Sequence, residues 1–174
     1  MRGTGIFIGG TLAVGVALAV LAQAGYGITV NVEPCLPLGN YWLVPAKPVR
    51  RGDIVQFCAP HDNPIVQFGV RRGWLGSGSC PDGTLPMLKE VAAVAGDTVT
   101  LTPPAVFING RAIHNTASRT TTLSGQDMPH IAYGTYTVPT GQFLPLGTNS
   151  PDSFDGRYFG FLHTSVIQHD AERF

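Results

Sequence analysis

The sequence Leu85-Pro-Met-Leu-Lys-Glu-Val-Ala-Ala-Val-Ala-Gly-Asp97 is apolar enough for a protein core, and it predicts a strand over residues 88–94. Lys89 is one of only two lysines in the chain, and we expect its amine to lie in or along this apolar packing. Burying an ammonium is costly, so such a lysine is either paired with a carboxylate or held as a neutral amine. A neutral amine can act as a general base, which makes the chain a candidate enzyme. The alternative is a lysine that packs its stem on apolar groups and extends its amine into water.

The composition predicts one mostly β domain that does not bind nucleic acid. The chain has 174 residues, a formal net charge of zero and 13% charged residues, which leaves no basic patch for a phosphate backbone. Its 22 glycines and 14 prolines suit many short strands and turns better than helices. We find no internal repeat or low-complexity tract in the sequence, so we expect a single globular domain besides any membrane segment.

Residues 1–26 have the features of a membrane anchor. No charged residue occurs from Gly3 to Val32, and residues 5–24 are long and apolar enough to span a bilayer as a helix. Arg2 and the amino terminus are the nearby charges, so the positive-inside rule places the N-terminus in the cytoplasm. We therefore expect a single-pass protein of the inner (cytoplasmic) membrane.

The rest of the chain, residues 27–174, is expected to be an exported β-rich domain, in the periplasm if the host is Gram-negative. A cleaved secretory signal is the competing interpretation, because Ala22-Gln-Ala24 fits a small-residue cleavage site. Both interpretations export the domain. The length of the apolar run favours a retained anchor.

The three cysteines fit an exported domain. Cys58 and Cys80 flank a loop that a disulfide between them would close, with a typical stabilisation of about 2–4 kcal/mol. Cys35 is left over, and an odd thiol in an exported protein indicates reactivity or intermolecular pairing, with a buried inert cysteine as the alternative. A metal site would require Cys58, Cys80 and His61 to converge; the disulfide is more economical, and we expect no cofactor.

Hydrophobic patterns predict about ten short strands. The expected strands are 27–32, 41–44, 52–58, 88–94, 98–101, 106–110, a hairpin of 135–138 with 142–146, and a closing strand at 158–163. The strand at 106–110 ends in Asn-Gly, the strongest short signal for a hairpin turn. Residues 59–84 and 115–130 are rich in polar and turn residues, and we expect them to be irregular.

Three pieces of the sequence carry side chains suited to peptide-bond chemistry: a turn with Cys35, the strand with Lys89, and a loop with Asp155 and Arg157. Together they resemble the signal peptidase I family, and they are most similar to the conjugative-transfer peptidases of the TraF type, which mature pilin subunits. The resemblance runs in register from the apolar segment to about residue 165, and the order and spacing of its motifs are specific. The matching segments are Asn31-Val-Glu-Pro-Cys-Leu-Pro-Leu-Gly-Asn-Tyr-Trp42, Gly52-Asp-Ile-Val55, Cys80-Pro-Asp-Gly-Thr-Leu-Pro-Met-Leu-Lys-Glu-Val91, Gly96-Asp97 and Ser153-Phe-Asp-Gly-Arg-Tyr-Phe-Gly160.

The resemblance implies a signal-peptidase-like antiparallel β domain on one N-terminal transmembrane helix, with the activity of a serine-type endopeptidase that uses a nucleophile–lysine dyad. By position Lys89 is the base, and Cys35 takes the place of the family's serine nucleophile. Glu33 takes a place that often holds a Ser or Thr whose hydroxyl helps to bind the oxyanion. The last motif usually reads Asp-Ser-Arg, and here it is Asp155-Gly-Arg157.

The departures at Cys35 and Glu33 have opposite consequences for catalysis. A thiol ionises more readily than a hydroxyl and is the better nucleophile, and a cationic Lys89 would also stabilise its thiolate. A carboxylate at position 33 would repel a developing oxyanion, and losing one oxyanion donor typically costs about 100- to 1000-fold in rate. Alternatively the Glu33 side chain points away and backbone N–H groups bind the oxyanion. The sequence leaves open whether Cys35 is native or an engineered replacement of serine.

Asp155 is expected to position other groups and not to act as a nucleophile. A carboxylate near Lys89 would orient the amine, although it would also favour the protonated form. Arg157 would hold the Asp155 loop through a bidentate pair, and the alternative is a surface Asp–Arg pair that caps a turn.

The resemblance also implies a membrane-embedded precursor, such as a pilin, as the protein partner. Its extended segment would add a strand to a sheet edge, with small side chains before the cleaved bond. Peptidases of the TraF type can also join the ends of a trimmed pilin into a ring. A thioester at Cys35 is relatively reactive toward amines, so cysteine is compatible with that step.

A non-catalytic scaffold in a conjugation or type IV secretion assembly is the rival interpretation, with Cys35 and Glu33 as marks of a lost site. A distance of roughly 3–4 Å between the Cys35 sulfur and the Lys89 amine favours the dyad. A separation of about 8 Å or more, with Glu33 between them, favours the scaffold. A thiol-disulfide protein is a weaker alternative, because the sequence has no Cys-x-x-Cys motif.

Overall fold

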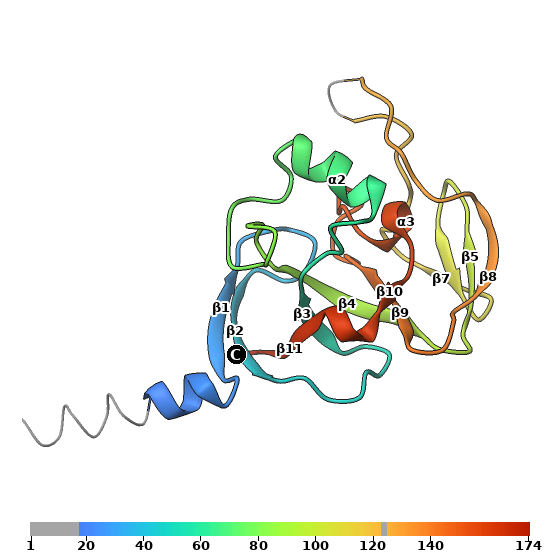
Figure 1. The fold of residues 1–174 in the computed structure, drawn as a ribbon. Coiled ribbons are helices and arrows are strands. Elements are labelled where there is room, and N and C mark those ends of the chain that lie inside the picture. The colour runs from blue at the N-terminus through green and yellow to red at the C-terminus, as the bar shows by residue number, and fades with distance from the viewer. Residues whose placement is uncertain (1–17, 123–124) are drawn as a thin grey trace, which may run out of the picture.

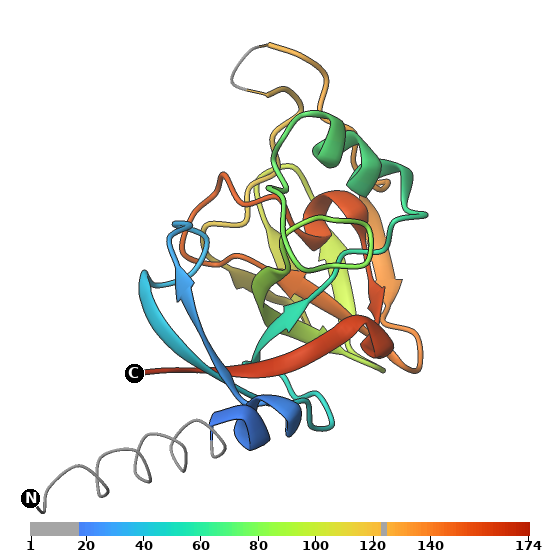
Figure 2. The same ribbon diagram turned by 60° about the vertical axis from the view of Figure 1, so that its left-hand side comes forward.

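The computed structural model describes residues 18–122 and 125–174, which form two antiparallel sheets (Figures 1 and 2). Across the larger sheet the strands are β1 (Gly27–Asn31), β2 (Gly39–Pro45), β11 (Ile167–Arg173), β3 (Ile54–Phe57), β4 (Met87–Val94), β9 (Gln142–Leu146) and β10 (Leu162–His163). Across the smaller sheet they are β7 (Arg111–Ile113), β6 (Val106–Ile108), β5 (Thr98–Leu101) and β8 (Gly134–Thr137). The mostly β, antiparallel fold class is confirmed.

The lysine-bearing strand lies inside the larger sheet. β4 pairs with β3 on one side and with β9 on the other, and Lys89 lies opposite Val55. The main apolar core packs around this part of the sheet and includes the buried side chains of Val55, Val91 and Phe143. A strand at this place explains why nearly all of its sequence is apolar.

The smaller sheet contains the predicted Asn-Gly hairpin. Asn109 and Gly110 both have positive φ, 51° and 80°, and connect β6 to β7. Two positive φ values are what a tight two-residue hairpin turn requires, and Asn and Gly adopt them at least cost. A second apolar cluster, which includes Val99 and Ile108, fills the space beneath this sheet.

The predicted hairpin of 135–138 with 142–146 is wrong. β8 pairs with β5 in the smaller sheet, whereas β9 pairs with β4 and β10 in the larger one. The turn between them therefore carries the chain from one sheet to the other. Pro139 and Gly141 give a local turn signal, but strand pairing is chosen by long-range contacts that this signal does not contain.

The predicted closing strand at 158–163 is also wrong. Its first half belongs to the short helix α3 (Gly156–Phe159), which is capped by the Asp155 side chain and is followed by Gly160 with a φ of 84°. Only β10 remains extended. The strand that completes the sheet is β11, which lies between β2 and β3. The pattern of apolar residues did not predict it, because its sequence Ile167-Gln-His-Asp-Ala-Glu-Arg173 is largely polar.

Residues 59–84, expected to be irregular, contain the helix α2 (Pro64–Arg71). The Asn63 side chain caps its N-terminus and Pro64 begins it, which is a standard helix-start signal. The predicted disulfide between Cys58 and Cys80 is present and ties both ends of this segment together. Because the two thiols are bonded to each other, they do not form a metal site with His61.

Most of the predicted membrane anchor lies outside the described residues. Residues 18–23 are helical and precede β1 (Figure 1). Among the helices of the described ranges, none is long and apolar enough to cross a bilayer.

Candidate active site

Cys35 lies in the turn between β1 and β2, and the buried side chain of Asn31 shapes that turn. The Asn31 amide nitrogen donates to the carbonyl oxygens of Glu33, Leu36 and Pro37 at 3.0–3.1 Å. Its amide oxygen accepts the backbone N–H of Glu33 at 3.2 Å. One side chain at the end of β1 thus fixes the backbone on both sides of the thiol.

The loop after β9 holds the same turn from the other side. The Asn149 backbone N–H donates to the carbonyl of Cys35 at 3.1 Å, and its side-chain amide donates to the carbonyl of Pro34 at 3.0 Å. Gly147 lies directly behind the thiol: a Cβ there would lie 2.8 Å from the Cβ of Cys35 and 2.3 Å from Oγ of Ser153. Glycine therefore permits a close approach that brings Cys35 and Ser153 together.

Lys89 is buried in β4, with 6% of its surface exposed. Its side chain forms no hydrogen bond or ion pair with the residues that the structure describes. Most of the Lys89 side chain is buried, but its amine nitrogen is not one of the fully enclosed atoms without a partner in the described structure, so it can be reached from the groove. An unpaired amine at the wall of a groove can exchange a proton with a group that binds there.

Cys35 and Lys89 line one groove, with a volume of about 850 Å³. The Cys35 sulfur is 4.0 Å from the carbonyl oxygen of Leu88, the residue next to the lysine, and 4.0 Å from that of Glu33. No hydrogen bond joins the sulfur to the Lys89 amine within the described chain. Cys35 and Lys89 thus share a groove without a hydrogen bond between them, and hydrogen bonds at catalytic sites often tighten only when substrate binds.

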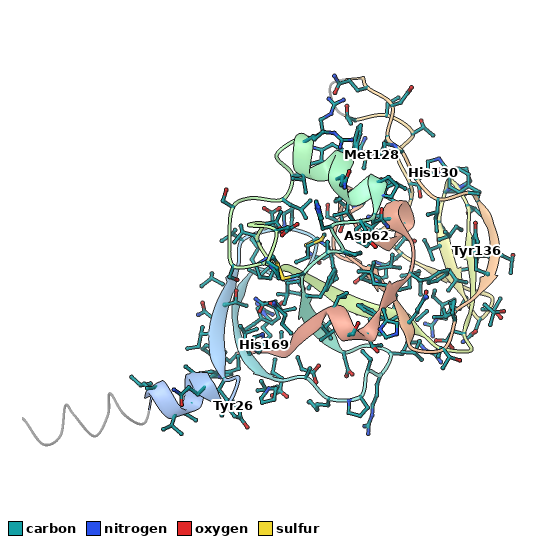
Figure 3. The ribbon with its side chains drawn as sticks, viewed as in Figure 1. Tyr26, Asp62, Met128, His130, Tyr136 and His169 are labelled. Carbon is teal, nitrogen blue, oxygen red and sulfur yellow. A yellow bond between two sulfur atoms is a disulfide. The ribbon has the colours of Figure 1, made fainter. Side chains whose placement is uncertain are left out.

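Segments far apart in the sequence form the walls of the groove. One wall is the end of β1 and the turn with Cys35, and the opposite wall is residues 85–89. The far part is lined by residues 72–76, after α2, and by residues within 119–122 and 126–128, where Met128 lies beside α2 in Figure 3. Tyr26 lies at the opposite end of the molecule in that view, next to the N-terminal helix.

Asp155 and Arg157 form a buried bidentate pair, not a surface pair. The Arg157 nitrogens Nε and Nη2 donate to the two Asp155 carboxylate oxygens at 2.9 and 3.0 Å, and both side chains are 0% exposed. Burial alone would lower the pKa of Arg157, but the charge and hydrogen bonds of Asp155 raise it above its ordinary value. The remaining N–H groups of Arg157 donate to backbone carbonyls, including those of Ala117 and Ser153 at 2.8 Å.

The pair holds the loop that packs behind Cys35. Asp155 also accepts the backbone N–H of Gly147 at 2.8 Å. Within the described residues Asp155 makes no ion pair with Lys89; it contacts the site through Gly147 and, by way of Arg157, through the Ser153 carbonyl. Asp155 is thus placed to position the loop, whereas the direct orientation of the lysine amine remains a prediction.

The Glu33 side chain is exposed and lines the groove. It does not pair with a cation in the described part of the chain. Its backbone, by contrast, is ordered by Asn31 on both its N–H and its carbonyl side. The turn therefore has a fixed backbone with a solvated carboxylate two residues before the thiol.

Two residues of the site were not singled out from the sequence. Asn31 was part of a matching segment, but its role as a hydrogen-bond hub depends on the turn geometry. Ser153 is buried in the groove wall, and its hydroxyl has no partner in the described structure. A hydroxyl without a partner close to Cys35 is free to bond to a group that enters the groove. Its place in the last matching segment, two residues before Asp155, is the signal that could have identified it.

Comparison with known proteins agrees with this geometry. The family model for signal peptidases, peptidase S26, matches residues 2–173. A plasmid transfer protein TraF from Escherichia coli is 35% identical, over 91% of this chain and 89% of that protein. A conjugal transfer protein TraF from Agrobacterium fabrum is 37% identical, over 81% and 78%. A signal peptidase I from Leptolyngbya laminosa is 27% identical, over 94% and 73%.

A solved signal peptidase I from Enterococcus faecalis is 22% identical, with a TM-score of 0.40, over 71% of this chain and 97% of that one. The assignment rests on the sequence matches and not on this structure. The family match covers nearly the whole chain, and the relatives named TraF exceed 30% identity over most of both sequences. The chain therefore belongs to the signal peptidase family, peptidase S26, and is related to TraF conjugal transfer proteins.

Proposed function

We infer that this chain is a membrane-anchored endopeptidase that matures a conjugative pilin precursor, with Cys35 as nucleophile and Lys89 as base. The observation that carries this inference is that Cys35 and a buried, unpaired Lys89 line the same groove. Relatives named as conjugal transfer proteins support a substrate from a conjugation system. The uncharged N-terminal segment supports an inner-membrane anchor with the catalytic domain in the periplasm.

The chemistry follows from the two side chains. Lys89 accepts the proton of the Cys35 thiol, and the thiolate attacks the carbonyl carbon of the scissile peptide bond. Lys89 then gives that proton to the departing amine, which leaves an acyl group on sulfur. Water completes hydrolysis, with Lys89 again accepting a proton. Ser153, whose hydroxyl lacks a partner in the described structure, is placed to hold the lysine amine or the substrate.

The substrate would bind as an extended segment. β1 is at the end of the larger sheet, so one of its edges has no strand partner there, and its last residues line the groove. An extended peptide satisfies such an edge by adding a strand. Residues 85–88 lie on the other side of the groove and would limit the size of the side chains next to the cleaved bond.

Ring closure of the trimmed precursor is a second outcome of the same acyl-enzyme. A thioester reacts with an amine more readily than an ester does, so Cys35 in place of serine favours transfer to an amine over transfer to water. The chemistry needs no further catalytic residue, because Lys89 accepts the proton of either nucleophile.

The test is to incubate the full chain, reconstituted in membranes, with its cognate pilin precursor and to measure intact masses. Wild type is expected to remove a C-terminal peptide, and Lys89→Ala to remove none. A further loss of one water from the trimmed product identifies ring closure. A wild-type protein that leaves the precursor intact, while Cys35→Ser cuts it, contradicts the role given to the thiol. An intact precursor with both proteins favours the scaffold interpretation instead.

A further inference from the structure

Among the described residues, some of the charged side chains that line the groove are paired with an opposite charge, and others are not. These charged side chains are those of Glu33, Arg72, Lys89, Arg119 and Asp152. Arg119 and Asp152 are paired with each other. Glu33 is thus a groove carboxylate that has no cationic partner among the described residues. Its charge remains available to a group that enters the groove.

The place of Glu33 relative to the thiol is fixed. Asn31 holds the Glu33 backbone from both sides, and the Glu33 carbonyl oxygen is 4.0 Å from the Cys35 sulfur. The side chain is exposed, so the carboxylate is in contact with water. The carboxylate belongs to a groove residue two positions before the thiol, and an anion in the same groove as an acyl-enzyme repels hydroxide and other anions and attracts cations.

We propose that Glu33 recruits a cationic primary amine, such as the N-terminal ammonium of a polypeptide, to the Cys35 thioester and so favours aminolysis over hydrolysis. This rests on the proposed function, since it requires an acyl group on Cys35. It gives the carboxylate a role at a position where it would be a disadvantage for simple hydrolysis. Glu33 is a specificity-determining residue here, because it selects the second substrate of the acyl transfer.

Atoms and charges balance in the transfer of the acyl group from Cys35 to the amine. The ammonium attracted by Glu33 releases one proton to solvent and becomes a free amine. The amine nitrogen attacks the thioester carbon, forming a C–N bond, and passes its extra proton to Lys89. The C–S bond breaks, and the leaving thiolate of Cys35 takes that proton back from Lys89. An ammonium and a thioester thus give an amide, a thiol and one proton in solution.

The test uses a small acyl donor, N-acetyl-alanine thiobenzyl ester, which acylates Cys35 with release of phenylmethanethiol. Glycinamide, a cation at neutral pH, is the acceptor, and mass spectrometry gives the ratio of amide product to hydrolysed acid. The ratio is expected to fall in the order wild type, Glu33→Gln, Glu33→Lys, by about two- to five-fold at each step at low salt. High salt is expected to reduce these differences, because screening weakens an attraction across solvent.

Two controls separate recruitment from a structural effect. Hydroxylamine is uncharged at neutral pH, so its ratio should be the same in all three proteins. Glu172→Gln removes an exposed carboxylate outside the groove and should leave the glycinamide ratio unchanged. If the glycinamide ratio is equal in wild type and Glu33→Gln, the role of Glu33 is wrong while the peptidase proposal stands. If wild type gives no acyl-enzyme that depends on Cys35, both fail.

Discussion

At the scale of single residues, the site depends on close packing behind the thiol. Gly147 allows the loop after β9 to touch Cys35, and the Asp155–Arg157 pair fixes that loop. The sequence resemblance identified Cys35, Lys89, Asp155 and Arg157, because these residues stand at matching positions. It gave no signal for Gly147, since its importance comes from a contact between segments far apart in the chain.

Substituting Gly147 with alanine is expected to abolish or strongly reduce peptidase activity. The new Cβ would lie well inside contact distance of Cys35 and Ser153, so one of the two segments must move, at a typical cost of about 1–3 kcal/mol. Gly27→Ala is the matched control, because a Cβ there meets Leu43 at 3.6 Å, which is ordinary contact. Precursor cleavage and urea unfolding of both variants measure the effect, and equal behaviour of the two would contradict the packing argument.

Asp155→Asn is expected to destabilise the fold by about 3–5 kcal/mol, because it leaves the buried Arg157 guanidinium without its counter-charge. Asp152→Asn removes the acid of an exposed pair with Arg119 and should change stability by about 1 kcal/mol or less. Urea denaturation midpoints of the two variants give the comparison. A loss for Asp155→Asn no larger than that for Asp152→Asn would mean that the buried pair adds little.

At the scale of elements, most strands could be predicted because their apolar residues alternate or form short buried runs, as in β4. The two wrong strand predictions have the same cause, which is strand pairing between distant segments. β11 is polar in sequence but has strand partners on both sides, and β8 pairs with β5 instead of β9. Long-range pairing is absent from a local pattern. The helix α2 has a start signal in Asn63 and Pro64. The many turn-forming residues of the segment 59–84 nevertheless favour an irregular structure, so its composition alone does not predict the helix.

The turn between β4 and β5 gives a pH prediction at this scale. Burial would raise the pKa of Asp97. Hydrogen bonds from the Val94 N–H and the Asn109 amide, together with the charge of Arg51, instead lower this pKa below 3.8. Its stabilising contribution is therefore complete above the unfolded value of 3.8 and is lost as pH falls through the lower folded value. Melting temperatures of Asp97→Asn should depend less on pH below about 4 than those of wild type. Asp62→Asn, at an exposed position, should follow wild type.

At the scale of the whole molecule, the groove is assembled from several segments. The first turn of the larger sheet supplies Cys35, a central strand supplies Lys89, and the disulfide-tied segment with α2 lines the far part. The N-terminal helix at residues 18–23 leads directly into β1, whose end lines the groove (Figure 2). β1 therefore connects the N-terminal helix to the turn that carries Cys35.

The anchor proposal predicts the behaviour of the intact protein in cells. A retained anchor keeps the full-length mass and makes the protein resist extraction by alkaline carbonate while detergent releases it. A mature protein that begins just after Ala24 and is freely soluble in the periplasm would support the cleaved signal instead. A reporter joined after residue 174 that is active only in the cytoplasm would contradict export altogether.

The central claim is that Cys35 carries the acyl group, and acid-quenched mass spectrometry during turnover of the cognate precursor tests it most directly. The account predicts a transient adduct on the peptide that contains Cys35, which neutral hydroxylamine removes, as expected for a thioester. The adduct should be absent from Lys89→Ala, because the thiol then lacks its base. Cleavage of the precursor by Cys35→Ala at the wild-type rate, with no adduct in wild type, would contradict the account.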